Sequence, residues 1–170
     1  MTVVYTIGYE GTDIDRFVDT LMVVGIKLVA DVRAVALSRK KGFSKTALRN
    51  RLEQAGIAYQ HFGALGDPKP GREAARQGKL GEFRSIYNHH LQGSEAQDAM
   101  TSLKLTVSQT PSCLLCFERD PTVCHRSIIA QSLKAAGTEV FDLYADSPSP
   151  YVDHATKLPR YHTREGVAAT

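Results

Sequence analysis

The sequence predicts an α/β domain, a three-layer Rossmann-like fold with a mostly parallel five-stranded sheet. Short runs rich in β-branched and aromatic residues alternate along the chain with stretches of helical apolar spacing. This alternation is typical of a parallel sheet with helices on both faces. The second run, residues 27–32, is almost continuously apolar, which indicates a strand covered on both sides.

Five strands are expected, because five short runs combine strand-forming residues with turn-forming residues at their ends. They cover residues 3–7, 27–32, 57–62, 112–117 and 138–143. The stretches between them carry apolar residues at helical spacing, and three of these stretches stop at a glycine. The expected helices cover residues 13–24, 44–55, 80–91, 95–107 and 124–136.

The first expected helix shows its pattern most clearly. Its apolar residues occupy one helix face, at Ile14, Phe17, Val18, Leu21 and Met22. Thr12 is the expected N-cap and Gly25 the expected stop. Residues 63–78 are different, because their glycines and prolines predict a long loop, a kind of segment that is often functional in a compact domain.

The expected organisation is an α/β domain over residues 1–144 followed by an irregular tail over residues 145–170, which contains three prolines. We expect the strand order 3-2-1-4-5, with the topological switch between the first and fourth strands. Ligands of such sheets bind outside the carboxyl ends of the strands at the switch. The functional site is therefore expected at that edge.

Composition excludes several classes of protein. The chain has 170 residues, the usual size of one domain, and a mild net charge of +3 that permits an anionic partner. No apolar run approaches the roughly 20 residues of a membrane-spanning helix, and the N-terminus lacks the layout of a signal peptide. A cytoplasmic protein without a membrane partner is expected. The three clustered cysteines argue against a disulfide framework.

Basic residues concentrate in one segment without any acidic residue, at Arg33, Arg39, Lys40, Lys41, Lys45, Arg49 and Arg51. Such a run is often only a solvated face. It could instead bind nucleic acid or another phosphate-bearing ligand. The surface expected for nucleic acid consists of Arg39, Lys40, Lys41, Phe43 and Lys45, with Phe43 and Tyr59 as stacking groups.

Two strand ends bring polar residues to the expected site. Gly8 and Gly11 allow a tight turn that brings backbone donors close to a ligand, and Tyr9 between them could point its hydroxyl into the cleft. The complete glycine fingerprints of dinucleotide-binding and phosphate loops are absent. At the end of the second strand, Asp31 and Arg33 should share one face, either as an ion pair or with Arg33 clamping an anion.

The third segment, residues 113–126, is the richest. Cys116 and Glu118 come at the end of the fourth strand, and Cys124, His125 and Arg126 open the next helix. A helix N-terminus lowers a thiol pKa and favours anions. Cys124 could be a nucleophile, a redox partner of Cys116, a metal ligand or a packing residue. Metal is the weakest alternative, because the only C-x-x-C pair should point to opposite faces of its strand.

These segments together resemble a known family. The matching pieces are Thr6-Ile7-Gly8-Tyr9, Leu28-Val29-Ala30-Asp31-Val32-Arg33, Phe43-Ser44-Lys45, Gly56-Ile57-Ala58-Tyr59, Leu65-Gly66, Leu115-Cys116-Phe117-Glu118 and Cys124-His125-Arg126. In this order they resemble the prokaryotic family named domain of unknown function DUF488, over residues 3–143. The resemblance implies a compact α/β domain and supplies no activity. This chain departs from the family pattern at residues 34–36, which lack its proline, and at Asp67, where the pattern has a glycine.

The leading hypothesis is an enzyme that binds a phosphate-bearing ligand, either a nucleotide or nucleic acid. Cys124, Glu118 and Asp31 are the candidate catalytic residues. The candidate ligand-binding residues are Gly8, Tyr9, Gly11, Arg33, Cys116, His125 and Arg126. The alternatives are a non-catalytic nucleic-acid-binding module and a thiol-redox protein that uses Cys116 and Cys124. The sequence identifies no metal and no cofactor.

Overall fold

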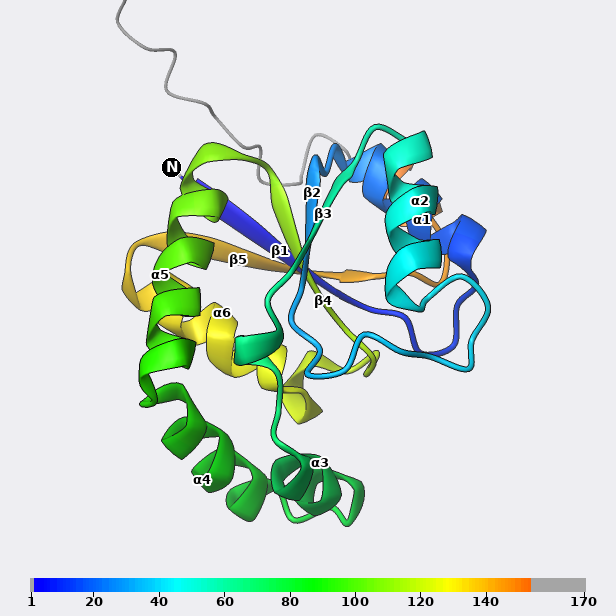
Figure 1. Ribbon diagram of the computed structural model, residues 1–170. Helices are drawn as coiled ribbons and strands as arrows, with labels where there is room; N and C mark the ends of the chain where they lie inside the picture. The colour runs from blue at the N-terminus through cyan, green and yellow to red at the C-terminus, as the bar shows by residue number, and fades with distance from the viewer. Residues whose placement is uncertain (1, 154–170) are drawn as a thin grey trace, which may run out of the picture.

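A twisted, all-parallel sheet of five strands forms the middle layer of the computed structural model, which describes residues 2–153 (Figure 1). The strands are Thr2–Gly8 (β1), Leu28–Asp31 (β2), Ala58–His61 (β3), Ser112–Cys116 (β4) and Thr138–Tyr144 (β5). Every pairing between neighbouring strands is parallel. The predicted α/β class with a five-stranded sheet is therefore confirmed.

The order of the strands is 3-2-4-1-5, so the predicted order 3-2-1-4-5 is wrong in the positions of β1 and β4. β4 lies between β2 and β1, with Ser112 paired to both Leu28 and Val4. All five residues of β4 are buried, which suits a central strand covered on both faces. The carboxyl ends of β2, β4 and β1 consequently lie side by side.

Helices cover both faces of the sheet. They are Ile14–Val24 (α1), Lys45–Gln54 (α2), Lys69–Arg76 (α3), Leu80–Leu91 (α4), Ser94–Gln109 (α5), His125–Ala135 (α6) and Ser149–Asp153 (α7), with short 3-10 turns at Gly63–Leu65 (η1) and Pro121–Val123 (η2). In Figure 1, α1 and α2 lie on one face and α5 and α6 on the other, while α3 and α4 extend beyond the carboxyl edge. No helix within residues 2–153 is long and apolar enough to span a bilayer.

Three local predictions need correction. Asp13 rather than Thr12 caps α1, because its carboxylate accepts from the Arg16 amide while the Thr12 hydroxyl donates to the Ala145 carbonyl. The expected loop over residues 63–78 contains η1 and α3. Pro70 is compatible with α3 because it stands in the first turn, where a backbone donor is not needed. In the expected irregular tail, residues 149–153 form α7, and residues 154–170 lie outside the described part.

Alternating side chains of the strands contribute to two separate cores. Leu114 and Cys116 of β4 pack on the face covered by α5 and α6, whereas Cys113 and Leu115 pack on the face covered by α1 and α2. The expectation that Cys113 and Cys116 point to opposite faces is therefore confirmed. Cys116 is directed toward the side from which α6 brings Cys124.

Candidate functional site

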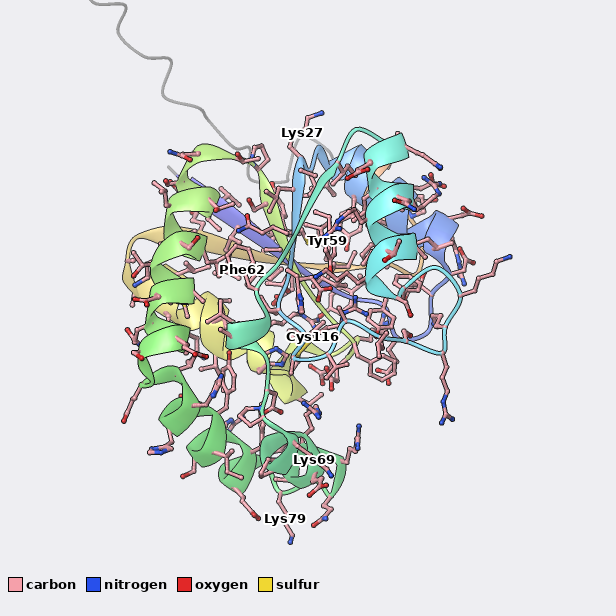
Figure 2. All side chains as sticks on the ribbon, viewed as in Figure 1. Lys27, Tyr59, Phe62, Lys69, Lys79 and Cys116 are labelled. Atoms are coloured by element: carbon pink, nitrogen blue, oxygen red, sulfur yellow. A yellow bond between two sulfur atoms is a disulfide. The ribbon has the colours of Figure 1, made fainter. Side chains whose placement is uncertain are left out.

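A pocket of about 640 Å³ lies at the carboxyl ends of β1, β2 and β4. In Figure 2, Cys116 lies at this end of the sheet, between the strands and α3. Six of the predicted site residues line the pocket: Tyr9, Arg33, Cys116, Glu118, Cys124 and His125. The predicted convergence of the three strand ends therefore brings these six side chains together.

Gly8 and Gly11 have backbone roles outside the pocket lining. A Cβ atom on Gly8 would lie 1.8 Å from the Glu118 carbonyl oxygen, so only glycine allows this close crossing of β1 and the segment after β4. Gly11 has a positive φ of 77°. The amides of Tyr9 and Glu10 donate to the carbonyls of Cys116 and Phe117. These two donors therefore serve the fold, contrary to the expectation that they face a ligand.

Asp31 and Arg33 form a buried ion pair, one of the two arrangements expected for them. Arg33 Nη2 and Nε lie 2.7 Å and 2.9 Å from the two carboxylate oxygens of Asp31, which is fully buried. Arg33 also donates to the Phe43 carbonyl and the Tyr9 hydroxyl, and the Tyr59 hydroxyl donates to Asp31. Burial and Asp31 together raise the pKa of Tyr59. Most donors of the Arg33 guanidinium are thus engaged inside the protein.

Arg126 is fully buried and does not line the pocket. Its guanidinium donates to the backbone carbonyls of Glu118 and Arg119, to the Thr6 hydroxyl and to Cys116 Sγ, at 2.9 Å. The Thr6 hydroxyl in turn donates to Asp142. Burial lowers the pKa of Arg126, and the Asp142 carboxylate partly offsets this. Arg126 therefore holds the segment after β4 against β1.

Cys116 and Cys124 are joined as a disulfide, and Cys113 is a free, buried cysteine. This pairing is one of the alternatives considered for Cys124, and a single bond is not the disulfide framework that the clustered cysteines argue against. β4 ends at Cys116 and α6 begins just after Cys124, so the fold brings the two sulfurs together across eight residues. Cys116 Sγ also lies 3.3 Å from Glu118 Oε2. Burial raises the pKa of Glu118.

His125 is held in one orientation beside the disulfide. Its Nε2 lies 2.6 Å from the Val32 carbonyl oxygen, and its Nδ1 lies 3.7 Å from Cys124 Sγ. Because a carbonyl only accepts, Nε2 carries the proton and Nδ1 presents its lone pair to Cys124. Burial lowers the pKa of His125 to about 4, so the ring is neutral at physiological pH.

Sequence reasoning named no site residue within residues 67–76, although it expected a long loop there of a kind that is often functional. Asp67, Arg72 and Arg76 line the pocket opposite the cysteines. Asp67 is 5% exposed, and its Oδ1 has no hydrogen-bond partner within residues 2–153. Burial raises the pKa of the Asp67 carboxyl to about 7, and the nearby Glu118 adds to this rise. The departure from the family pattern at position 67 was the available signal.

The raised pKa of Asp67 predicts a pH-dependent stability. The folded protein keeps a proton on this carboxyl between its ordinary pKa of 3.8 and about 7, whereas the unfolded chain loses it. The protonated Asp67 carboxyl therefore makes its full contribution to stability below pH 3.8, and this contribution is lost as the pH rises to 7. We expect the free energy of unfolding of Asp67→Asn to exceed that of the unsubstituted protein by about 1–3 kcal/mol at pH 8. At pH 4 the two free energies should be nearly equal.

Urea denaturation at pH 4, 6 and 8 measures this difference. Asp19→Asn, which removes an exposed carboxyl on α1, is the matched control and should leave the pH dependence unchanged. Parallel stability curves for Asp67→Asn and the unsubstituted protein would show that Asp67 is ionised normally in the folded state.

The surface expected for nucleic acid is only partly exposed. Phe43 is fully buried and stacks on Tyr9, with ring centroids 4.5 Å apart, so its predicted role as a base-stacking group is wrong. Lys40 Nζ donates to the carbonyls of Tyr9 and Thr12 and ties its loop to the end of β1. Arg39, Lys41 and Lys45 are exposed. Lys40 and Phe43 therefore have structural contacts, and three basic residues of the expected surface remain exposed.

The family profile described as "Domain of unknown function DUF488" matches residues 13–133. The match is shorter at both ends than the resemblance over residues 3–143, yet it includes β2, β4 and the first residues of α6. No curated protein gives a significant match to the chain. No solved structure does so either.

Proposed function

The chain belongs to the DUF488 family, whose description carries no activity, and we propose on the basis of its pocket that it catalyses thiol–disulfide exchange. The supporting observation is the disulfide between Cys116 and Cys124 in the wall of the pocket. This proposal takes up the thiol-redox alternative and assigns the two cysteines different roles. Cys113 has no part in it, because it is buried on the other face of the sheet.

Cys124 Sγ is the sulfur that a substrate thiolate would attack. Arg126 Nη1 donates to Cys116 Sγ at 2.9 Å, so the electron pair released from the sulfur–sulfur bond is best stabilised on Cys116. The attack forms a bond between the substrate sulfur and Cys124 Sγ, breaks the protein disulfide, and leaves Cys116 as a thiolate. A second substrate thiolate then displaces Cys124. Two thiols become one disulfide, and the protein becomes a dithiol.

The same steps in reverse would reduce a substrate disulfide. The Cys116 thiolate resolves the mixed disulfide on Cys124, and the protein disulfide forms again. Glu118, whose Oε2 lies 3.3 Å from Cys116 Sγ, is placed to exchange a proton with this sulfur. Asp31 acts through Arg33, which it holds in position beside Tyr9.

The pocket favours a substrate with both apolar and anionic parts. Val35, Leu37 and Phe117 line it and are exposed, so they can contact an apolar group. Arg72 and Arg76 lie on its α3 side. The anionic ligand of our leading hypothesis would then be the carboxylate or phosphate of such a thiol, bound by these two arginines rather than by Arg126.

Single cysteine variants test the assigned roles. With a disulfide substrate, reduced Cys116→Ser should form a stable mixed disulfide through Cys124, because no resolving thiol remains. Cys124→Ser should form a mixed disulfide through Cys116 at least tenfold more slowly, because Cys116 is stabilised as a leaving group rather than as the attacking thiolate. Mass spectrometry of the intact protein after addition of a small aromatic disulfide measures both species.

Cys113→Ala is the matched control and should keep the exchange rate of the unsubstituted protein. The oxidised protein should also show one reactive thiol after denaturation, and the reduced protein three. Equal trapping by Cys116→Ser and Cys124→Ser would overturn the assignment of roles. Three thiols after denaturation of a sample treated with excess diamide, a strong thiol oxidant, would overturn the exchange function itself.

A further inference from the structure

The cysteines of the pocket wall have a second chemistry when they are reduced. One ligand atom each of Cys116, Cys124 and His125 lies within 4.8 Å of the other two, and all three residues are buried. Two thiolates and one imidazole are ligands that Zn²⁺ prefers. We propose that the reduced protein binds one Zn²⁺ ion through these three side chains. The sequence gave a metal little weight, because its only C-x-x-C pair, Cys113 and Cys116, points to opposite faces of a strand.

The orientation of His125 supports this site. The contact of Nε2 with the Val32 carbonyl, at 2.6 Å, leaves the lone pair of Nδ1 free to coordinate an ion. A backbone carbonyl in this position is a frequent partner of metal-binding histidines. The 3.7 Å between Nδ1 and Cys124 Sγ is close to the roughly 3.5 Å that separates nitrogen and sulfur ligands around tetrahedral Zn²⁺.

The backbone leaves room for the sulfurs to separate after reduction. The Cα atoms of Cys116 and Cys124 are 7.4 Å apart. Two thiolates on one Zn²⁺ ion lie about 3.8 Å apart, a distance that side-chain rotation can reach across this span. β4 fixes one cysteine and the start of α6 fixes the other, so coordination needs no rearrangement of the strands or helices.

The surrounding charges are compatible with a bound cation. Two thiolates neutralise Zn²⁺, so the adjacent Arg126 guanidinium does not oppose the complete site, and its hydrogen bond to Cys116 Sγ stabilises that thiolate. Glu118 Oε2 lies 3.3 Å from the same sulfur. The Glu118 carboxylate, or a water in the pocket, can therefore occupy the fourth position.

Zinc binding and the disulfide exclude each other. Binding one ion releases the two thiol protons of Cys116 and Cys124. Oxidation to the disulfide converts both thiolate ligands into a bonded pair that cannot coordinate the metal. The inference uses the same cysteines as the proposed exchange function but does not rest on it, because a reduced protein could bind Zn²⁺ without exchanging disulfides.

The experiment uses the full chain, reduced and freed of reductant under argon. Titration with Zn²⁺ against a chromophoric chelator should give one ion per chain with a dissociation constant below 1 μM, a strength ordinary for such ligands. Cys116→Ser and Cys124→Ser should each weaken binding at least 100-fold. Cys113→Ala, which removes the third thiol, is the control and should bind as tightly as the unsubstituted protein.

Two measurements on the unsubstituted protein guard against variants that fail to fold. Co²⁺ in place of Zn²⁺ should give the near-ultraviolet charge-transfer absorption of a cobalt–thiolate bond. Zn²⁺ should raise the melting temperature of the reduced protein and leave that of the oxidised protein unchanged. The inference is overturned if reduced protein shows neither effect, or if Cys113→Ala loses as much affinity as Cys124→Ser.

The outcomes separate the two proposals. If the protein binds Zn²⁺ but never forms the Cys116–Cys124 disulfide under oxidising conditions, the exchange function fails and the metal site stands. If the disulfide forms and exchanges while the reduced protein binds no metal, the metal site fails and the exchange function stands.

Discussion

Asp31→Asn should lower the free energy of unfolding by about 3–5 kcal/mol. Asp31 is fully buried and accepts hydrogen bonds from the Arg33 amide, from the Arg33 side chain and from the Tyr59 hydroxyl. The amide of asparagine keeps the shape but removes the negative charge. A guanidinium that is 6% exposed then remains without a counter-ion.

Urea denaturation measures the loss, and a double-mutant cycle identifies its source. Arg33→Met in the Asp31→Asn background should recover part of the stability, because the unpaired charge is gone. Asp13→Asn is the matched control. It neutralises the exposed pair with Arg16 while keeping a good N-cap, and should leave the free energy of unfolding nearly unchanged. If Asp31→Asn loses no more stability than the Asp13→Asn control, the buried pair is not a stabilising contact.

Arg126→Met should lower the free energy of unfolding by about 3–4 kcal/mol. Its partners include the backbone carbonyls of Glu118 and Arg119, which would lose their hydrogen-bond donor. These carbonyls would then be buried without a partner or would have to bind water. Removing the cost of burying the guanidinium offsets part of this loss. We expect Arg126→Lys to recover little, because one ammonium cannot reproduce the planar set of donors.

Hydrogen exchange distinguishes a local effect from general destabilisation. Residues 117–120 should lose amide protection in Arg126→Met before the centre of the sheet does, because Arg126 holds their backbone against Thr6. Lys134→Met removes an exposed cation from the same helix and is the matched control. Unchanged protection of residues 117–120 would mean that Arg126 does not anchor this segment.

The two predictions concern residues that sequence patterns mark as functional but that the structure places in supporting roles. Asp31 interrupts an apolar strand, and Arg126 follows a cysteine and a histidine at a helix start. Such residues suit a ligand site and a structural network equally well. Only the distances decide between these interpretations, and they show Arg126 bonded to backbone carbonyls and Asp31 bonded to Arg33.

Local sequence patterns specify the fold class and the approximate extents of the strands, because strand and helix periodicities are local properties. They also specify that the ends of β1, β2 and β4 carry the polar residues. The sequence patterns did not determine the strand order, because this order depends on which strand has neighbours at both edges and helices on both faces. β4, with all five residues buried, takes the central position that local patterns had assigned to β1.

The composition of the pocket depends on contacts between segments that are far apart in the sequence. Asp67, Arg72 and Arg76 come from a segment whose glycines and prolines predict a loop, and they line the same pocket as the cysteines because this segment, with α3, lies beyond the carboxyl edge of the sheet. The tertiary structure also decided that Cys116 pairs with Cys124 while Cys113 stays free. The physical reason is that strand alternation fixes the face of a cysteine, whereas its partner depends on where a distant helix begins.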